Sequence, residues 1–165
     1  MLHIAGINYE SIADSEGMAC TIFFSGCKHY CEGCYSQDTW DFNYGEEVTD
    51  ELIETINSEI DKRPFLSALV LSGGDPMYSA LEVVKFIQKI HVPKNNIWCY
   101  SGFKFEDIQK DNNMKQLLDK CNVLIDEQFE EDKKDLTLKF RGSSNQRVID
   151  IKKSLEQNKV VLWCD

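Results

Sequence analysis

Three of the cysteines lie within eight residues of one another: Cys27, Cys31 and Cys34, in the pattern C-x3-C-x2-C. Three thiolates on one short loop suit a soft metal ion or an iron–sulfur cluster. A zinc site or an all-cysteine cluster needs a fourth protein ligand. No fourth cysteine follows at a ferredoxin-like spacing, and the nearest one outside the pattern is Cys20. The simplest interpretation is a four-iron cluster with one iron open to a substrate. A structural zinc site with a distant fourth ligand is the alternative.

The sequence around the cysteines predicts a strand that positions them. Residues 19–24 are mostly β-branched or aromatic, and Ser25-Gly26 then predicts a turn. Further apolar periodicities predict helices near 49–62, 79–90, 105–120 and 146–157, and strands near 3–7, 67–71, 96–100, 122–126, 136–140 and 160–164. Thr49 is the expected N-cap of the first helix, and Ser79 with Glu82 forms an expected capping box for the second. Asn112-Asn113 is the expected break in the third.

This alternation of strands and helices predicts an α/β fold with a mainly parallel sheet. A chain of 165 residues is too short for a closed eight-stranded barrel. The expected architecture is therefore an incomplete (partial) β/α barrel or an open α/β sheet.

Four polar or glycine-bearing segments begin where predicted strands end. They start at Ser25, Ser72, Ser101 and Asp126, and the second reads Ser-Gly-Gly-Asp. Because the carboxyl ends of parallel strands meet at one edge of a sheet, we expect these segments to gather around the cysteines. The sequence thus predicts a site assembled at this edge.

The cysteine pattern resembles the cluster motif of the radical S-adenosylmethionine (SAM) superfamily. Longer stretches, from about residue 20 to 146, resemble more narrowly the activating proteins of anaerobic ribonucleotide reductases, which are glycyl-radical activating enzymes. The resemblance implies a partial β/α barrel of the radical SAM type. It also implies that Cys27, Cys31 and Cys34 bind a [4Fe-4S] cluster.

The resemblance also implies two SAM-binding segments. Gly33, Cys34 and Tyr35 resemble the segment whose backbone meets the adenine, although many relatives have an aromatic residue where Gly33 stands. For Tyr35, packing in the core is an equal alternative. Gly73 and Gly74 resemble the glycine-rich element that binds the methionine end of SAM.

Other polar residues near these segments are harder to assign, and several have more than one interpretation. Asp75 stands where many relatives have Glu. Ser101 and Asp126 are either SAM contacts or a turn serine and a strand-end carboxylate. Arg141 pairs with the SAM carboxylate, with a partner protein or in a surface salt bridge. His29 is expected to face solvent or to support the cysteines rather than to bind metal.

The activity that the resemblance implies is the reductive cleavage of SAM to methionine and a 5′-deoxyadenosyl radical. That radical would remove hydrogen from a backbone glycine in the large subunit of the reductase, and a protein such as a flavodoxin would donate the electron. Two alternatives remain open. One is a different radical SAM enzyme, with another glycyl-radical protein or a small molecule as substrate. The other is a zinc or electron-transfer module.

Composition restricts the class of protein further. Residues 1–165 are expected to form a single domain, with 42% apolar residues available for a core. The net charge of −10 argues against nucleic-acid binding, which depends on clustered Lys and Arg. The start of the chain lacks the basic segment followed by an apolar segment that is typical of a signal peptide. No apolar segment approaches the length of a membrane helix. We therefore expect no membrane association, and reduced cysteines in a cytoplasmic protein.

Overall fold

Parallel strands form the centre of the protein. The computed structural model describes residues 1–164, and in it β2 (Ala19–Phe24), β4 (Ala68–Gly73), β5 (Ile97–Tyr100) and β6 (Val123–Asp126) pair side by side in parallel. Nearly every residue of β2 and β6 is buried, because the chain covers both faces of the sheet. The predicted strand and helix alternation is confirmed for this central part.

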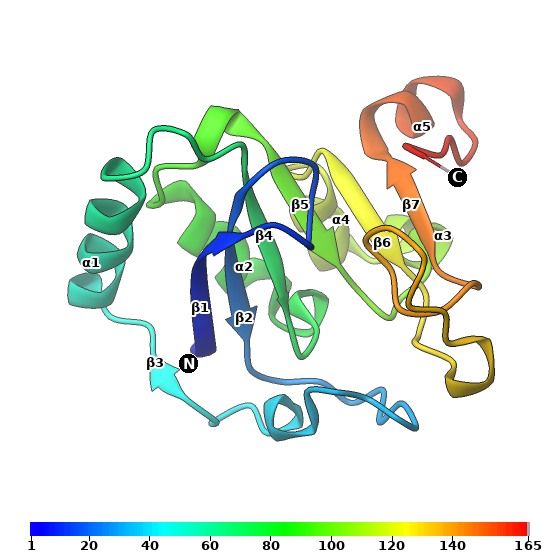
Figure 1. Cartoon of the computed structure of the whole chain (residues 1–165), viewed down its shortest axis with the longest axis horizontal. Coiled ribbons are helices and arrows are strands. Elements are labelled where there is room, and N and C mark those ends of the chain that lie inside the picture. The colour runs from blue at the N-terminus through cyan, green and yellow to red at the C-terminus, as the bar shows by residue number, and fades with distance from the viewer. Residues whose placement is uncertain (165) are drawn as a thin grey trace.

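Antiparallel strands complete the sheet on both sides. At one side β1 (His3–Ser11) pairs with β2, and β3 (Glu46–Glu47) pairs with β1. At the other side β7 (Arg147–Asp150) pairs with β6. The strand order is β3-β1-β2-β4-β5-β6-β7, so β3 and β7 form the two edges of an open sheet (Figure 1). The chain therefore has a mixed α/β fold that does not close on itself.

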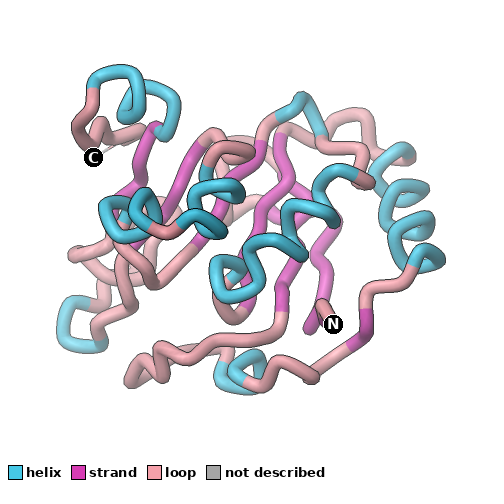
Figure 2. The backbone as a smooth tube through the Cα atoms, turned by 180° about the vertical axis from the view of Figure 1, so that it is seen from behind, coloured by secondary structure: helices cyan, strands magenta, loops and turns pink. Residues whose placement is uncertain are grey.

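Helices form a layer on one face of this sheet. Figure 2 shows α2 (Ala80–Gln88), α3 (Phe105–Lys110) and α4 (Asn112–Leu118) on that face, while α1 (Asp50–Asp61) lies near the β3 edge and α5 (Ile151–Gln157) follows β7 at the other end. Single turns of 3-10 helix occupy Gln37–Trp40, Pro76–Ser79, Pro93–Asn95 and Glu131–Lys133. Among the described residues, no helix is both long and apolar enough to span a membrane.

The main core lies between the sheet and the helices. Side chains of β2 and β4 such as Ile22 and Leu71 are fully buried there, and the Phe24 ring contacts Phe86 of α2 edge-on at 5.5 Å. Burial of such side chains stabilises the fold by roughly 1.5–3 kcal/mol each. This packing holds β2 and β4 rigidly, and the candidate site lies at their ends.

A smaller apolar cluster covers the opposite face of the sheet. It includes Val70 of β4 and Trp98 of β5. The Trp98 ring contacts Phe140 at 5.1 Å and Trp163 at 5.6 Å between ring centres. Two segments far apart from β5 in the sequence therefore shield this face from water.

Helix ends agree with the sequence in two places and differ in a third. The Thr49 side chain accepts a hydrogen bond from the Leu52 N–H and caps α1, as predicted, and Asp111 caps α4 where the break was expected. The Ser79 side chain makes no cap hydrogen bond, so the predicted capping box is wrong. The reason is that residues 76–79 already form a 3-10 turn, which Asp75 caps through the Met77 N–H.

The C-terminal third departs most from the prediction. Residues 136–140 form turns instead of a strand, and Leu136 is 81% exposed. The helix expected from residue 146 begins only at Ile151, because residues 147–150 pair with β6 as β7. Residues 160–164 form only an isolated bridge, between Leu162 and Ile149. The predicted strands at 136–140 and 160–164 are therefore wrong.

Candidate cofactor site at the carboxyl ends of the strands

The cysteine loop and the glycine loop leave the sheet side by side. Phe24 and Gly73 are Cα partners at the ends of the parallel strands β2 and β4. Beyond them, the Gly74 N–H donates to the Phe24 carbonyl at 2.8 Å and the Asp75 N–H to the Gly26 carbonyl at 3.0 Å. The predicted convergence of strand ends is confirmed here. In Figure 1 the segment that carries the cysteines runs along the lower edge of the sheet.

Glycine is required at positions 73 and 74 by close backbone packing. Gly73 has a φ of +105°, which L residues rarely adopt. A Cβ on Gly74 would lie 2.7 Å from the Gly26 carbonyl oxygen and 2.8 Å from that of Thr39. These glycines therefore let the two loops touch. Their predicted contact with SAM stays a prediction.

Asp75 connects three loops through one buried carboxylate. The residue is 2% exposed, and its Oδ1 accepts a hydrogen bond from the Met77 N–H at 2.9 Å. Its Oδ2 accepts from the Ser101 hydroxyl and from the Gly102 N–H, both at 2.9 Å. The same oxygen lies 2.7 Å from Nε2 of His29. A loop from each of β2, β4 and β5 thus meets at this group.

The His29 side chain points inward and not into solvent. Its side chain is only 6% exposed, and its ring packs against Phe103 and Tyr78 with ring centres 4.7 and 5.1 Å away. The ring also lies over Gly102, where a Cβ would come within 2.6 Å of it. The solvent-facing alternative for His29 is wrong. Its place beside the cysteines agrees with a supporting role.

The three cysteine thiols are free and differ in exposure. Cys27 is 8% exposed at the root of the loop, whereas Cys31 and Cys34 are half-buried. Burial raises the pKa of the Cys27 thiol to about 12 and also raises that of Cys31. Because metals bind the thiolate, ligation must displace these protons. Among residues 1–164, no three His, Cys, Asp or Glu side chains are already grouped to hold a metal ion. The cluster ligands therefore stay a prediction that requires the loop to draw its thiols together.

The donor chemistry fits an iron–sulfur cluster with three protein ligands. Cys20, the nearest other cysteine, is fully buried in the core, four residues back from the end of β2 and so roughly 13 Å along the strand. It therefore cannot serve as a fourth ligand. Nε2 of His29 is already bonded to Asp75. The loop offers three soft sulfur donors, the set that a cluster with one open iron needs.

The end of the cysteine loop faces the segment that follows β6. The Cys31 sulfur lies 3.9 Å from Oε1 of Gln128. The Glu131 carboxylate covers Gly33, since a Cβ there would lie 1.5 Å from Oε2. Tyr35 is 71% exposed, with the Lys134 ammonium 5.0 Å from its ring centre, so the alternative of a core aromatic is wrong. Whether Gly33, Cys34 and Tyr35 meet adenine stays a prediction.

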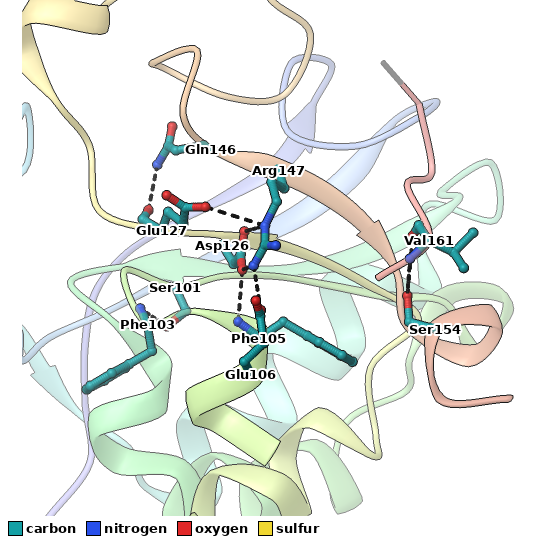
Figure 3. A network of polar contacts seen from close by, with 10 residues as sticks. All are labelled: Ser101, Phe103, Phe105, Glu106, Asp126, Glu127, Gln146, Arg147, Ser154 and Val161. Atoms are coloured by element: carbon teal, nitrogen blue, oxygen red, sulfur yellow. Dashed lines mark hydrogen bonds and ion pairs between the residues drawn. The ribbon is translucent and has the colours of Figure 1, made fainter. Parts of the chain in front are cut away.

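Asp126 and Arg147 form a buried ion pair that fixes the loop after β6 (Figure 3). Asp126 is fully buried and accepts hydrogen bonds from the Phe105 N–H at 2.8 Å and from Nε of Arg147 at 3.0 Å. Arg147 also reaches the carboxylates of Glu106 and Glu127, at 2.7 and 3.4 Å. The guanidinium lowers the pKa of Glu106 through its hydrogen bond. Asp126 is thus engaged within the fold.

The remaining candidates are also held by the protein itself. The Ser101 hydroxyl donates to Asp75, and the Arg141 guanidinium donates to the Gln146 carbonyl at 2.9 Å. The roles of Arg147 and Gln128 were not predicted from the sequence. Arg147 fell within a predicted helix, and no pattern marked Gln128. The His29–Asp75 contact had a weak signal, a polar residue in each of two loops expected to meet.

A hollow lies beside the cysteine loop. It has a volume of about 700 Å³ and is lined by residues including Lys28, His29, Phe103 and Gln128. A second hollow of about 500 Å³ shares His29 and Gln128 and reaches Cys31. Ligand pockets commonly range from about 300 to 1,000 Å³. Both hollows therefore have the volume of a nucleoside pocket, and the second borders Cys31, whereas Gly73 and Gly74 line neither.

Comparisons with known proteins agree with this site. A family model described as a 4Fe-4S single cluster domain matches residues 13–149, which supports an iron–sulfur cluster over zinc. Relatives from several organisms carry the name anaerobic ribonucleoside-triphosphate reductase-activating protein. The protein of Salmonella typhimurium is 38% identical, covering 83% of this chain and 91% of its own. That of Escherichia coli is 39% identical with the same coverage, and that of Enterobacteria phage T4 is 33% identical over 86% and 93%.

Proposed function

The chain belongs to the family of anaerobic ribonucleoside-triphosphate reductase-activating proteins, and from this premise we propose that it is a radical SAM enzyme. It would install a glycyl radical on an anaerobic ribonucleotide reductase. The observation that carries the proposal is the loop of three free thiols joined by hydrogen bonds to the glycine loop. The open sheet would accordingly be a partial β/α barrel of the radical SAM type, within a single domain of residues 1–165.

Cys27, Cys31 and Cys34 would hold the cluster and leave one iron for SAM. When bound, the reduced cluster and SAM supply a 5′-deoxyadenosyl radical that can remove hydrogen from a glycine backbone. Gly73 and Gly74 would bind the methionine end of SAM, and the backbone of residues 33–35 would bind the adenine. The segment after β6 would close the site on the side of Cys31, which keeps water from the reacting atoms.

The large subunit of the reductase is the proposed protein substrate. The hollow beside the cysteine loop has a volume of about 700 Å³, within the range of small-ligand pockets, so a reacting glycine would have to come from a partner bound over it. A short chain with an open site fits a reaction in which the partner completes the enclosure. A flavodoxin is the proposed electron donor and the cytoplasm the proposed location, where seven unpaired cysteines would stay reduced.

Anaerobic reconstitution with iron and sulfide tests the cofactor. We expect about four irons per chain and dithionite-dependent formation of 5′-deoxyadenosine from SAM. Replacing Cys27, Cys31 or Cys34 by Ala is expected to abolish both, while the control Cys164→Ala retains both. Zinc in the purified protein, or a cluster that does not respond to SAM, would refute the proposal.

The protein substrate needs its own test. The reconstituted protein is incubated with SAM, a reductant and an anaerobic ribonucleotide reductase, and electron paramagnetic resonance then detects any glycyl radical. We expect the doublet of a glycyl radical on the large subunit. Its appearance only on another glycyl-radical protein would favour the alternative of a radical SAM enzyme with a different substrate.

A further inference from the structure

The His29 side chain occupies a niche shaped for an imidazole. Asp75 provides the acceptor, Phe103 and Tyr78 provide aromatic walls, and Gly102 leaves the space in which the ring lies. His29 stands between the first and second cysteines of the loop. The niche therefore anchors the part of the loop that carries Cys27 and Cys31.

Most of the hydrogen-bonding capacity of the Asp75 carboxylate is used by the protein. Oδ2 accepts from His29, Ser101 and Gly102, and Oδ1 accepts from the Met77 N–H. A carboxylate oxygen offers about two lone-pair sites, so little capacity remains for a ligand. A Glu at this position would carry one more methylene in a fully packed site, which is unfavourable. Asp at position 75 thus suits an internal contact better than a contact with a substrate.

We propose that His29 and Asp75 are positioning residues, whose hydrogen bond fixes the cysteine loop against the glycine loop and the loop after β5. The inference rests on the proposed function, because it concerns where the open iron faces relative to SAM. The role proposed for both side chains is to hold the loops, although His29 also lines the two hollows beside the cysteine loop. Their contact holds three loops in one arrangement, in which Cys27 and Cys31 would hold a bound cluster beside the glycine loop.

His29→Leu tests the inference in the reconstituted full-length protein, because it keeps the bulk of the ring and removes its hydrogen bond. His29→Gln is the conservative variant, since its amide N–H can reach Asp75. His91→Leu is a matched control. His91 also bonds to an aspartate, Asp61, at 2.9 Å, but both side chains are about 60% exposed and lie outside the site. Iron content, SAM affinity and the electron paramagnetic resonance spectrum of the reduced cluster are measured for each.

We expect His29→Leu to retain the iron content of the wild type, because all three cysteines remain. Its affinity for SAM is expected to fall about tenfold, the effect of losing one hydrogen bond to a charged group. The spectral change that SAM causes in the wild type is expected to be reduced. His29→Gln restores most of the affinity and of the spectral change, and His91→Leu behaves as the wild type.

Gly102→Ala provides a second, independent test that changes neither polar partner. Its Cβ would come within 2.6 Å of the His29 ring and displace the ring from Asp75. The same loss of SAM affinity is expected. Both substitutions break the same contact, that between His29 and Asp75. The double variant His29→Leu with Gly102→Ala is therefore expected to lose no more SAM affinity than His29→Leu alone.

Two results would overturn the inference. Wild-type SAM affinity and spectra in both His29→Leu and Gly102→Ala would show that the contact positions nothing. Loss of iron from His29→Leu, to the level of Cys31→Ala, would show that His29 is needed to hold the cluster itself, which is more than the positioning role proposed. The proposed function fails by a different result, a wild-type protein whose cluster ignores SAM.

Discussion

Burial separates the core cysteines from Cys31 and Cys34 of the cysteine loop, and Cys27 at the root of that loop is buried like the core cysteines. Cys20, Cys99 and Cys121 lie in the core, where burial raises the pKa of the Cys20 thiol to about 12. A hydrogen bond with Cys121, together with burial, raises the pKa of Cys99 well above its ordinary value. The Cys20 and Cys99 thiols therefore stay protonated and unreactive at neutral pH. Cys31 and Cys34 are half-buried on the loop, so solvent and iron can reach them.

Alkylation of the reduced, metal-free protein at neutral pH should follow this division. Iodoacetamide is expected to modify Cys31, Cys34 and Cys164 before the three core cysteines, because attack requires an accessible thiolate. Peptide mass spectrometry over a time course measures the order. Early labelling of Cys99 in the folded protein would contradict the expected order, and labelling in denaturant is the control.

At position 74 the addition of a single methyl group is expected to destabilise the folded protein. Gly74→Ala places a Cβ against two backbone carbonyl oxygens that cannot move without shifting both loops. The expected cost is about 1–3 kcal/mol of the free energy of unfolding. Denaturant unfolding measures it, with Gly6→Ala as the matched control, since a Cβ at Gly6 meets nothing within 4 Å. Equal stability of the two variants would refute this account of Gly74.

At the scale of elements, the central strands could be predicted and β7 could not. Runs such as residues 19–24 and 122–126 are apolar and bounded by polar turns, so local sequence is enough. Residues 147–150 form a strand because they pair with β6 and because Arg147 reaches Asp126, both of which are tertiary effects. The same distinction holds in the site. Parallel topology predicts which loops meet, whereas the direction of the His29 side chain depends on packing.

The ion pair that anchors β7 allows a stability test. Arg147→Met leaves the fully buried Asp126 without its charged partner, which is expected to cost about 3–5 kcal/mol. Arg63→Met, which breaks surface pairs with Glu10 and Glu59, is expected to cost much less, because solvent screens these charges. Urea unfolding followed by circular dichroism compares the two. A cost for Arg147→Met no greater than that for Arg63→Met would exclude a structural role for the pair.

At the scale of the whole molecule, rigid and adaptable regions are separated. Strands β2, β4, β5 and β6 are packed on both faces, whereas the segments 27–36 and 127–134 contact each other mainly through single side chains such as Gln128 and Glu131. Drawing the three thiols together around a cluster would therefore move the loops and not the sheet.

Hydrogen exchange under anaerobic conditions tests this separation. On reconstitution and addition of SAM, amides in 27–36 and 127–134 are expected to gain protection, while those of α1 stay unchanged. Mass spectrometry of peptides reports both regions in one experiment. A change in amide protection centred on α1, or no change in either loop, would contradict the expected separation of a rigid sheet from adaptable loops.

The pairing of Phe24 with Gly73 restricts how the length of this chain can vary. One extra residue inside β2 or β4 would reverse every side chain beyond it and move one loop along the sheet by about 3.3 Å. An extra residue between α3 and α4 would leave that alignment untouched. A library of single-codon insertions, selected by growth without oxygen in cells that depend on this gene, would then recover changes near residue 111 and none between residues 19 and 26 or between 68 and 75.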